Sequence, residues 1–285
     1  EELRLAGLEL SDRTIRNYLA EADRRGWTEN LGRRGRRLTS TGVRETEGAL
    51  VIDKVGFVAA RVDELAYQMS FDVFTRKGKV ILNISTLDVR DLERTVGRLL
   101  AVYDAGLGMG KYLAIGREGE RLGSFRVPRG KIAIGTICSV SINGVLLRER
   151  IATTSRFGGL LELENGEPKR FTQVIHYDGT SLDPLEIFIR GGMTSVYQAA
   201  KTGMGVIGAS FREVPSVALQ DVRRLATRSE AVGLGGVFAI GRPNQPVLGV
   251  PVPEGRTGMI VCGGLNVVAA VVEAGISCSS VAMST

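Results

Sequence analysis

An internal duplication limits the folds open to this chain more than any other feature of its sequence. Residues 112–117 (YLAIGR) match 237–242 (VFAIGR), and residues 127–131 (VPRGK) match 252–256 (VPEGR). Three more pairs of short segments match in the same order, at an offset of about 125 residues: 91–94 with 221–224, 137–139 with 261–263, and 151–155 with 276–280. Five matches in one order indicate two copies of one unit, at about residues 79–163 and 205–285.

Each copy is predicted to alternate strands and helices. The expected order is strand, helix, strand, a Val-Pro-x-Gly turn, a buried strand that ends in cysteine, a short helix and a last strand. In the first copy Asn165-Gly166 predicts a type I′ hairpin turn, and helices near 184–190 and 194–202 are expected between the copies. The expected fold class is α/β, or closely mixed α+β, with a cleft between two similar halves.

Residues 1–45 have a different pattern from the body at 46–285. Residues 1–8 have the pattern of a helix end, with Gly7 as the stop. Ser11 is predicted to cap a second helix, whose apolar stripe recurs at helical spacing and which Gly26 ends. A winged helix has a further helix before this point, so this module is expected to be incomplete at its N-terminus if that helix is absent.

A basic hairpin is predicted next, with extended residues on both sides of the turn at 32–37 (GRRGRR). Helix, capped helix and basic hairpin follow one another as in a winged helix-turn-helix, which places its second helix in the major groove and its wing on phosphates. A solvated helix followed by a charged loop is the alternative. The winged-helix interpretation predicts that DNA is contacted by Arg13, Thr14, Arg16, Asn17, Arg33, Arg34, Arg36 and Arg37.

The charge distribution agrees with that interpretation. The net charge is only +6, but residues 24–44 carry seven arginines against a single acid, Glu29. The apolar content of 44% excludes a disordered chain, and no apolar run is long enough for a membrane span. Three dispersed cysteines argue against a disulfide framework, so a reducing cytoplasm is the expected location.

The junction between a buried strand and a short helix is the first candidate ligand site. Cys138, Ser139, Ser141 and Asn143 lie there, where free N–H groups and the helix dipole favour an anion. The second copy has Cys262-Gly-Gly at the same junction, so the two copies together suit a ligand with two carboxylates. Ordinary capping of the helix by the serines is an equally good interpretation.

Arg156, followed closely by two glycines, is the second candidate, because an arginine can hold a carboxylate through two hydrogen bonds. A strand with a glycine bulge and an exposed arginine is the alternative. His176, the only histidine, and Asp178 are the only candidate bases for an enzyme, and no catalytic signature surrounds them. One histidine and dispersed cysteines also argue against a zinc site, so no metal or cofactor is expected.

Four segments resemble the family of nitrogen regulatory repressors called NrpR. They are residues 11–19 (SDRTIRNYL), 32–39 (GRRGRRLT), 155–160 (SRFGGL) and 179–194 (GTSLDPLEIFIRGGMT). The resemblance extends over essentially the whole chain, with length for one regulatory domain, whereas some members of the family carry two in tandem.

The resemblance implies a transcriptional repressor of nitrogen-assimilation genes that binds palindromic double-stranded DNA operators as a homo-oligomer, expected to be a dimer. Its regulatory domain would bind 2-oxoglutarate as an allosteric effector, and binding would weaken the hold on DNA. The residues expected to contact the effector are Cys138, Ser139, Ser141, Asn143, Arg156 and Thr180. An enzyme that acts on a small acid, or a sensor that acts through protein partners, remain the alternatives.

Overall fold

The computed structural model describes residues 11–48, 56–123 and 125–284. The chain divides into two compact units, Glu1–Lys54 and Val55–Thr285. The sequence placed the division after residue 45, but helix α3 (Ser40–Gly48) runs across that point. Residues 1–10, including the helix end predicted before Gly7, lie outside the described residues.

In the first unit the local predictions are confirmed. Helix α2 (Asp12–Arg24) begins where the Ser11 side chain accepts a hydrogen bond from the Thr14 N–H, and Gly26 follows it with a φ of 69°. Strands β1 (Thr28–Asn30) and β2 (Arg36–Leu38) pair antiparallel around a 3-10 turn at Gly32–Arg34. The predicted basic hairpin therefore forms, with its last two arginines inside β2.

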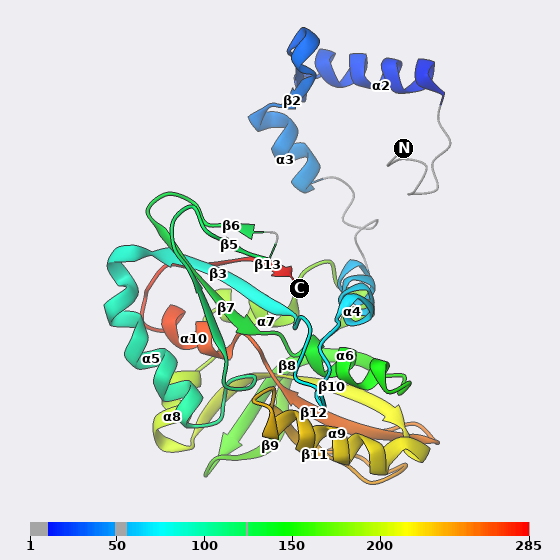
Figure 1. Ribbon diagram of the computed structural model, residues 1–285, viewed down its shortest axis with the longest axis vertical. Helices are drawn as coiled ribbons and strands as arrows, with labels where there is room; N and C mark the ends of the chain where they lie inside the picture. The colour runs from blue at the N-terminus through cyan, green and yellow to red at the C-terminus, as the bar shows by residue number, and fades with distance from the viewer. Residues whose placement is uncertain (1–10, 49–55, 124, 285) are drawn as a thin grey trace. The chain divides into compact units, whose positions relative to one another are not determined.

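The second unit holds two large antiparallel sheets and a two-stranded hairpin, β5-β6, with helices around them (Figure 1). The larger sheet has the strand order β11-β12-β10-β8-β9, and the smaller has β13-β3-β7-β4. Its strands are β3 (Leu82–Asp88), β4 (Leu113–Gly116), β5 (Arg121–Leu122), β6 (Phe125–Arg126), β7 (Lys131–Ile137), β8 (Thr154–Glu164), β9 (Glu167–His176), β10 (Gly205–Pro215), β11 (Val237–Ile240), β12 (Arg256–Cys262) and β13 (Cys278–Ser284). Its helices are α4 (Phe57–Gln68), α5 (Leu92–Asp104), α6 (Val140–Arg148), α7 (Pro184–Arg190), α8 (Val196–Thr202), α9 (Leu219–Ala231) and α10 (Asn266–Val272).

The duplication is visible in the order of these elements. The first copy runs β3-α5-β4-β7-α6-β8, and the second runs β10-α9-β11-β12-α10-β13. The paired helices bury the same stripe: Leu99 and Val102 in α5, and Val222 and Leu225 in α9, at helical spacing. The mixed α and β fold class is confirmed, and so is the turn at Asn165-Gly166, where both residues have positive φ.

The two copies exchange their last strands, which the sequence did not predict. Strand β8 ends the first copy but pairs with β10 of the second, while β13 ends the second copy and pairs with β3 of the first. Each sheet is therefore completed by the other copy. Helix α4 and the β5–β6 hairpin were also not predicted.

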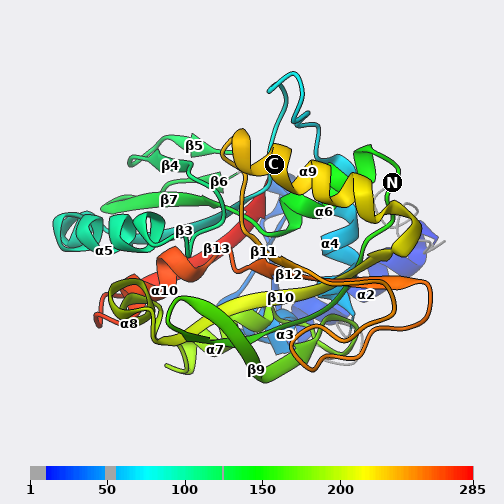
Figure 2. The same ribbon diagram turned by 90° about the horizontal axis from the view of Figure 1, so that it is seen from below.

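The two largest apolar cores of this unit lie on opposite sides. One lies among α5, α7, α8, α10 and the facing surfaces of both sheets, and the other lies among α4, α6 and α9. Figure 2 shows these two groups of helices at opposite ends of the sheets. Strand β10 contributes to both cores, because Ile207, Ala209 and Phe211 face the first and Val214 faces the second.

Candidate functional site

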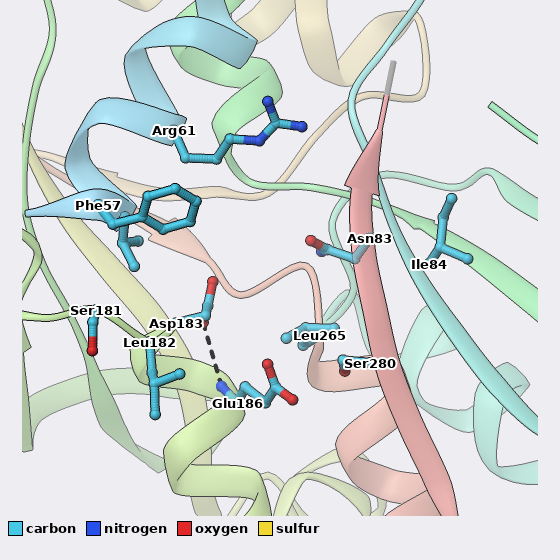
Figure 3. A pocket seen from close by; sticks show the side chains of 11 residues that line it. Phe57, Arg61, Asn83, Ile84, Ser181, Leu182, Asp183, Glu186, Leu265 and Ser280 are labelled. Atoms are coloured by element: carbon cyan, nitrogen blue, oxygen red, sulfur yellow. Dashed lines mark hydrogen bonds between the residues drawn. The ribbon is translucent and has the colours of Figure 1, made fainter. Parts of the chain in front are cut away.

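A cavity of about 360 Å³ lies where the two copies meet, within the range of small-molecule sites. Helix α4 forms one wall, β3 and β13 form a second, and the segment that leads into α7 forms a third (Figure 3). Its lining residues are Phe57, Val58, Arg61, Asn83, Ile84, Ser181, Leu182, Asp183, Glu186, Leu265 and Ser280. Residues of both copies therefore line one open cavity, in agreement with the cleft predicted between the two halves.

Polar groups project into this cavity from three sides. Arg61 and Asn83 extend toward the same space from α4 and β3, and Asp183 approaches it from the start of α7 (Figure 3). The Asp183 carboxyl accepts hydrogen bonds from the N–H groups of Leu185 (2.8 Å) and Glu186 (3.3 Å). Burial raises the pKa of Asp183 above its ordinary value. The cavity thus has a cation, an amide and two carboxyl groups, those of Asp183 and Glu186, on its walls.

Cys138 connects this cavity to a buried cation. The Cys138 thiol interacts by hydrogen bonding with Asn83 of the cavity wall, and it lies in the electrostatic field of Arg212 on β10. Burial raises the pKa of Cys138 to about 12, so its thiol is neutral near pH 7. Burial likewise raises the pKa of the Tyr177 hydroxyl, another neighbour of Arg212. Neither neighbour supplies a negative charge at neutral pH.

Arg212 is buried without an ionic partner. Its side chain lies on the face of β10 toward α6, and the residue is only 1% exposed. Nη1 donates to Ser210 Oγ at 2.7 Å and Nη2 donates to Ser139 Oγ at 3.2 Å, while Nε has no hydrogen-bond partner. No described carboxylate forms a salt bridge with it, although an arginine keeps its charge at neutral pH. Buried charges are normally paired, so this arrangement favours an anionic ligand.

The start of helix α6 adds to this positive field. Ser139 is the N-cap residue of α6, and its side chain makes no capping hydrogen bond within the helix. The helix dipole places partial positive charge at this end, beside the Arg212 guanidinium. A cation beside a helix N-terminus is unfavourable by itself. A carboxylate between the Arg212 guanidinium and the start of α6 would interact favourably with both groups.

The two junctions singled out in the sequence lie against each other. A Cβ on Gly264 would stand 3.0 Å from the Cys138 Cα and would overlap the backbone oxygen of Ile137 and the amide of Asn83. Glycine at this position therefore permits the close approach of the two junctions. The junction of the second copy is filled by protein, because the Asn266 amide bonds Gly208 and the Leu107 carbonyl.

Cys138 and Ser139 are the predicted effector residues that the structure brings together with Arg212. Ser141 is occupied by both backbone groups of Ile81, and Asn143 donates to Ser155 and leaves its Oδ1 without a partner. Thr180 bonds Leu182 within its own turn. These three side chains form structural hydrogen bonds apart from the cavity.

Arg156 lies in a second, more polar cavity of about 530 Å³, together with His176 and Asp178. Its Nη1 donates to Glu213 Oε1 and to the Pro251 carbonyl oxygen, both at 2.8 Å. Unlike Arg212, this arginine already has a carboxylate partner inside the protein. Sequence reasoning missed Arg212, and its one available signal was an Arg-Glu pair near the end of the apolar strand 206–214.

In the first unit, Arg13, Arg16 and Asn17 lie on the exposed side of α2. Arg36 and Arg37 are held in ion pairs with Asp23 (2.9 Å) and Glu29 (2.7 Å), so both help to fix the hairpin. Arg34 is exposed and makes no ion pair with described residues, and the Arg33 side chain lies outside the described atoms. The Thr14 hydroxyl contacts Ser11 Oγ.

The described residues lack two further features. No helix among them has the length and apolar character that crossing a membrane requires. No group of three His, Cys, Asp or Glu side chains in residues 11–48, 56–123 and 125–284 is arranged to hold a metal ion.

Comparison with known proteins identifies the family. Residues 55–285 match the family model of NrpR regulatory domains NRD1 and 2. The whole chain is 36% identical to the global nitrogen regulator NrpRI of Methanosarcina mazei and covers 88% of that protein. Over 93% of the chain it is 29% identical to the global nitrogen regulator NrpR of Methanococcus maripaludis, of which it spans only 46%.

A solved structure agrees with these matches. The crystal structure of a nitrogen repressor-like protein from Methanococcus jannaschii has a TM-score of 0.66 and 28% identity, over 79% of this chain and 91% of that one. The relatives are named as regulators and the matched model describes regulatory domains, so the chain is a nitrogen-related regulator and not an enzyme. The chain belongs to the NrpR family.

Proposed function

We propose that this protein is a DNA-binding repressor of nitrogen-assimilation genes whose second unit senses 2-oxoglutarate. The observation that carries the effector half of the proposal is Arg212, a buried cation without an ionic partner beside a helix N-terminus. A dicarboxylate supplies the missing negative charge. The family's place in nitrogen regulation supports a small acid of nitrogen metabolism as the ligand.

The geometry suits two carboxylates. One is proposed to pair with Arg212 and to accept a hydrogen bond from the Ser139 hydroxyl, beside the start of α6. The other is proposed to lie in the 360 Å³ cavity and to draw Arg61 away from its exposed partner Glu64. Asn83 stands between the two positions, since it lines the cavity and contacts Cys138. No cofactor or metal has a part in this scheme.

For the DNA half, α2 is proposed as a recognition helix and the β1–β2 hairpin as a wing. Arg13, Arg16 and Asn17 are exposed on one helix, where arginine and asparagine can reach base edges in a major groove. Arg34 at the hairpin turn is proposed to contact phosphate. A homodimer, with twice the 30.6 kDa mass of one chain, is proposed as the binding species, because palindromic sites match two-fold protein symmetry.

The proposed coupling between ligand and DNA runs through α4. This helix is the first described element of the second unit, and its residues Phe57, Val58 and Arg61 line the cavity. A ligand that draws these side chains inward favours one position of α4 over another. That population shift would change the spacing of the two recognition helices in the dimer and weaken operator binding.

The test is fluorescence anisotropy with duplexes selected from a random library by the full-length protein. Millimolar 2-oxoglutarate is expected to raise the Kd for the selected duplex, while glutamine, which has an amide in place of the second carboxylate, should have little effect. A protein that binds the duplex with the same Kd with and without 2-oxoglutarate would contradict the sensing half. A protein that binds 2-oxoglutarate but no duplex would instead indicate a sensor acting through protein partners.

A further inference from the structure

The β5–β6 hairpin of the second unit carries a group of unpaired arginines. Four arginines lie within thirteen residues and are exposed: Arg117, Arg121, Arg126 and Arg129. None of them forms a salt bridge with any described residue. The segment also holds Glu118 and Glu120, but these carboxylates accept hydrogen bonds from the N–H groups of Gly130 (2.9 Å) and Arg117 (2.8 Å).

Two of these arginines face each other across the hairpin. Arg121 and Arg126 are direct cross-strand partners, and Leu122 pairs with Phe125. Like charges directly opposite each other destabilise an antiparallel pair. The arrangement therefore costs folding free energy, and an anion bound between the two guanidinium groups would offset that cost.

The apolar pair of the same hairpin holds it in place. Leu122 and Phe125 pack on a small core of Ile84, Val127 and Ala133 on the outer face of the smaller sheet. Successive side chains of a strand point to opposite faces, so Arg121 and Arg126 point away from this core. The packing of Leu122 and Phe125 thus fixes the hairpin, with the Arg121 and Arg126 side chains on its opposite face.

The corresponding segment of the second copy lacks this feature. Residues 117–131 carry five cations and two acids, a net charge of +3, whereas residues 242–256 carry two cations and one acid, a net charge of +1. Arg256 there is committed to Thr154 and to the Glu213 carbonyl. The repeated fold does not need the arginine pair, so its presence in one copy calls for another reason.

We propose that this hairpin binds the phosphate backbone of double-stranded DNA. Guanidinium groups hold phosphates through paired, charge-assisted hydrogen bonds, and a two-stranded hairpin can follow a groove edge. The second unit then adds affinity without sequence preference to the contacts of the first. This inference rests on the DNA binding proposed above, but it assigns a separate surface.

The test measures how binding of the full-length protein to a non-specific duplex depends on salt. The slope of log K against log salt concentration is negative, and each lost phosphate contact reduces its magnitude by about 0.9. The slope of the Arg121→Gln/Arg126→Gln variant is therefore expected to be smaller in magnitude than that of the wild type by about 1.8. Arg126→Gln alone should lose about half of that. Arg242→Gln, at an exposed position of the other copy, should leave the slope unchanged.

The outcomes separate this inference from the proposed function. The double variant should unfold at the same or a higher temperature than the wild type, since it loses a like-charge pair. A folded double variant with an unchanged slope overturns the inference, and the proposed function survives if Arg13→Gln/Arg16→Gln weakens binding. A wild type that binds no duplex at low salt overturns both. Thermal protection by pyrophosphate that only the hairpin variants lose, with an unchanged DNA slope, would assign a free phosphate compound instead.

Discussion

At the residue scale, two arginines on neighbouring strands show the difference between a structural charge and a charge that is available to a ligand. Arg156 on β8 reaches Glu213, whose side chain is nearly buried, and forms an internal pair. Arg212 on β10 reaches only hydroxyl groups and keeps its Nε without a partner. A protein gains no stability from burying such a charge alone, so we attribute Arg212 to ligand binding.

This contrast gives a prediction for unfolding in urea. Arg212→Met should leave the free energy of unfolding unchanged or raise it, because a buried unpaired charge is replaced by an apolar chain. Arg156→Met should lower it by about 1–3 kcal/mol, because Glu213 loses its nearest partner. An Arg212→Met variant destabilised as much as Arg156→Met would show that Arg212 is structural.

The cysteines give a second prediction at this scale. Burial raises the pKa of Cys138 and of Cys262 to about 12 and that of Cys278 to about 11. Thiolate is the reactive form, so the native protein should react very slowly with a thiol reagent at pH 8, and all three thiols should react in denaturant. Rapid reaction of one thiol in the native state would mean that the cavity wall around Cys138 or the β13 edge opens frequently.

How much of the site was predictable follows from how local each contact is. Cys138 and Ser139 were found because the strand-to-helix junction is a feature of one short segment. Arg212 was not found, because Ser139, one of its hydrogen-bond partners, lies 73 positions away along the chain. Arg156 was predicted as an effector contact. Its pairing with Glu213 could not be predicted, because that pairing depends on a strand register that the sequence does not reveal.

At the element scale, local chemistry predicted the ends of helices and turns well. The Ser11 cap, the Gly26 stop and the Asn165-Gly166 turn each depend on residues within one turn of the chain. Helix α4 was missed although four of its residues are buried in the second core. The β5–β6 hairpin has only two residues a strand, too few for an alternating pattern to appear.

The contact between α2 and its hairpin predicts a pH dependence. Arg36, with help from Thr28, holds the pKa of Asp23 below its ordinary value of 3.8. A lowered pKa means that the carboxylate form stabilises the fold, so this contribution is present above the ordinary value and is lost as the pH falls through the lowered one. Trp27, the only tryptophan, lies between α2 and β1 and reports the change by fluorescence. Asp23→Asn should remove the acid transition, and a transition that persists in this variant would contradict the assignment.

At the scale of the whole molecule, strand exchange makes the two copies interdependent. The matching words revealed the duplication, but the partner sheet of β8 and β13 could not be predicted, since antiparallel edges of both sheets accept a strand of the same pattern. The exchange also explains why one cavity receives Asn83 from the first copy and Leu265 and Ser280 from the second.

The interdependence can be tested with two fragments, 55–203 and 204–285, divided at a turn with positive φ. Each alone lacks the strand that completes its sheet and should show little cooperative unfolding by circular dichroism. Mixed together, they should restore the native spectrum. A fragment that folds cooperatively alone would show that strand exchange does not tie the copies together.

The central claim is that Arg212 and the adjoining cavity bind 2-oxoglutarate, and isothermal titration tests it most directly. The wild type and Arg156→Met are expected to bind 2-oxoglutarate saturably, with Arg212→Met showing no heat of binding while remaining folded. Normal binding by a folded Arg212→Met together with loss of binding in Arg156→Met would contradict the account and would place the effector in the cavity beside His176.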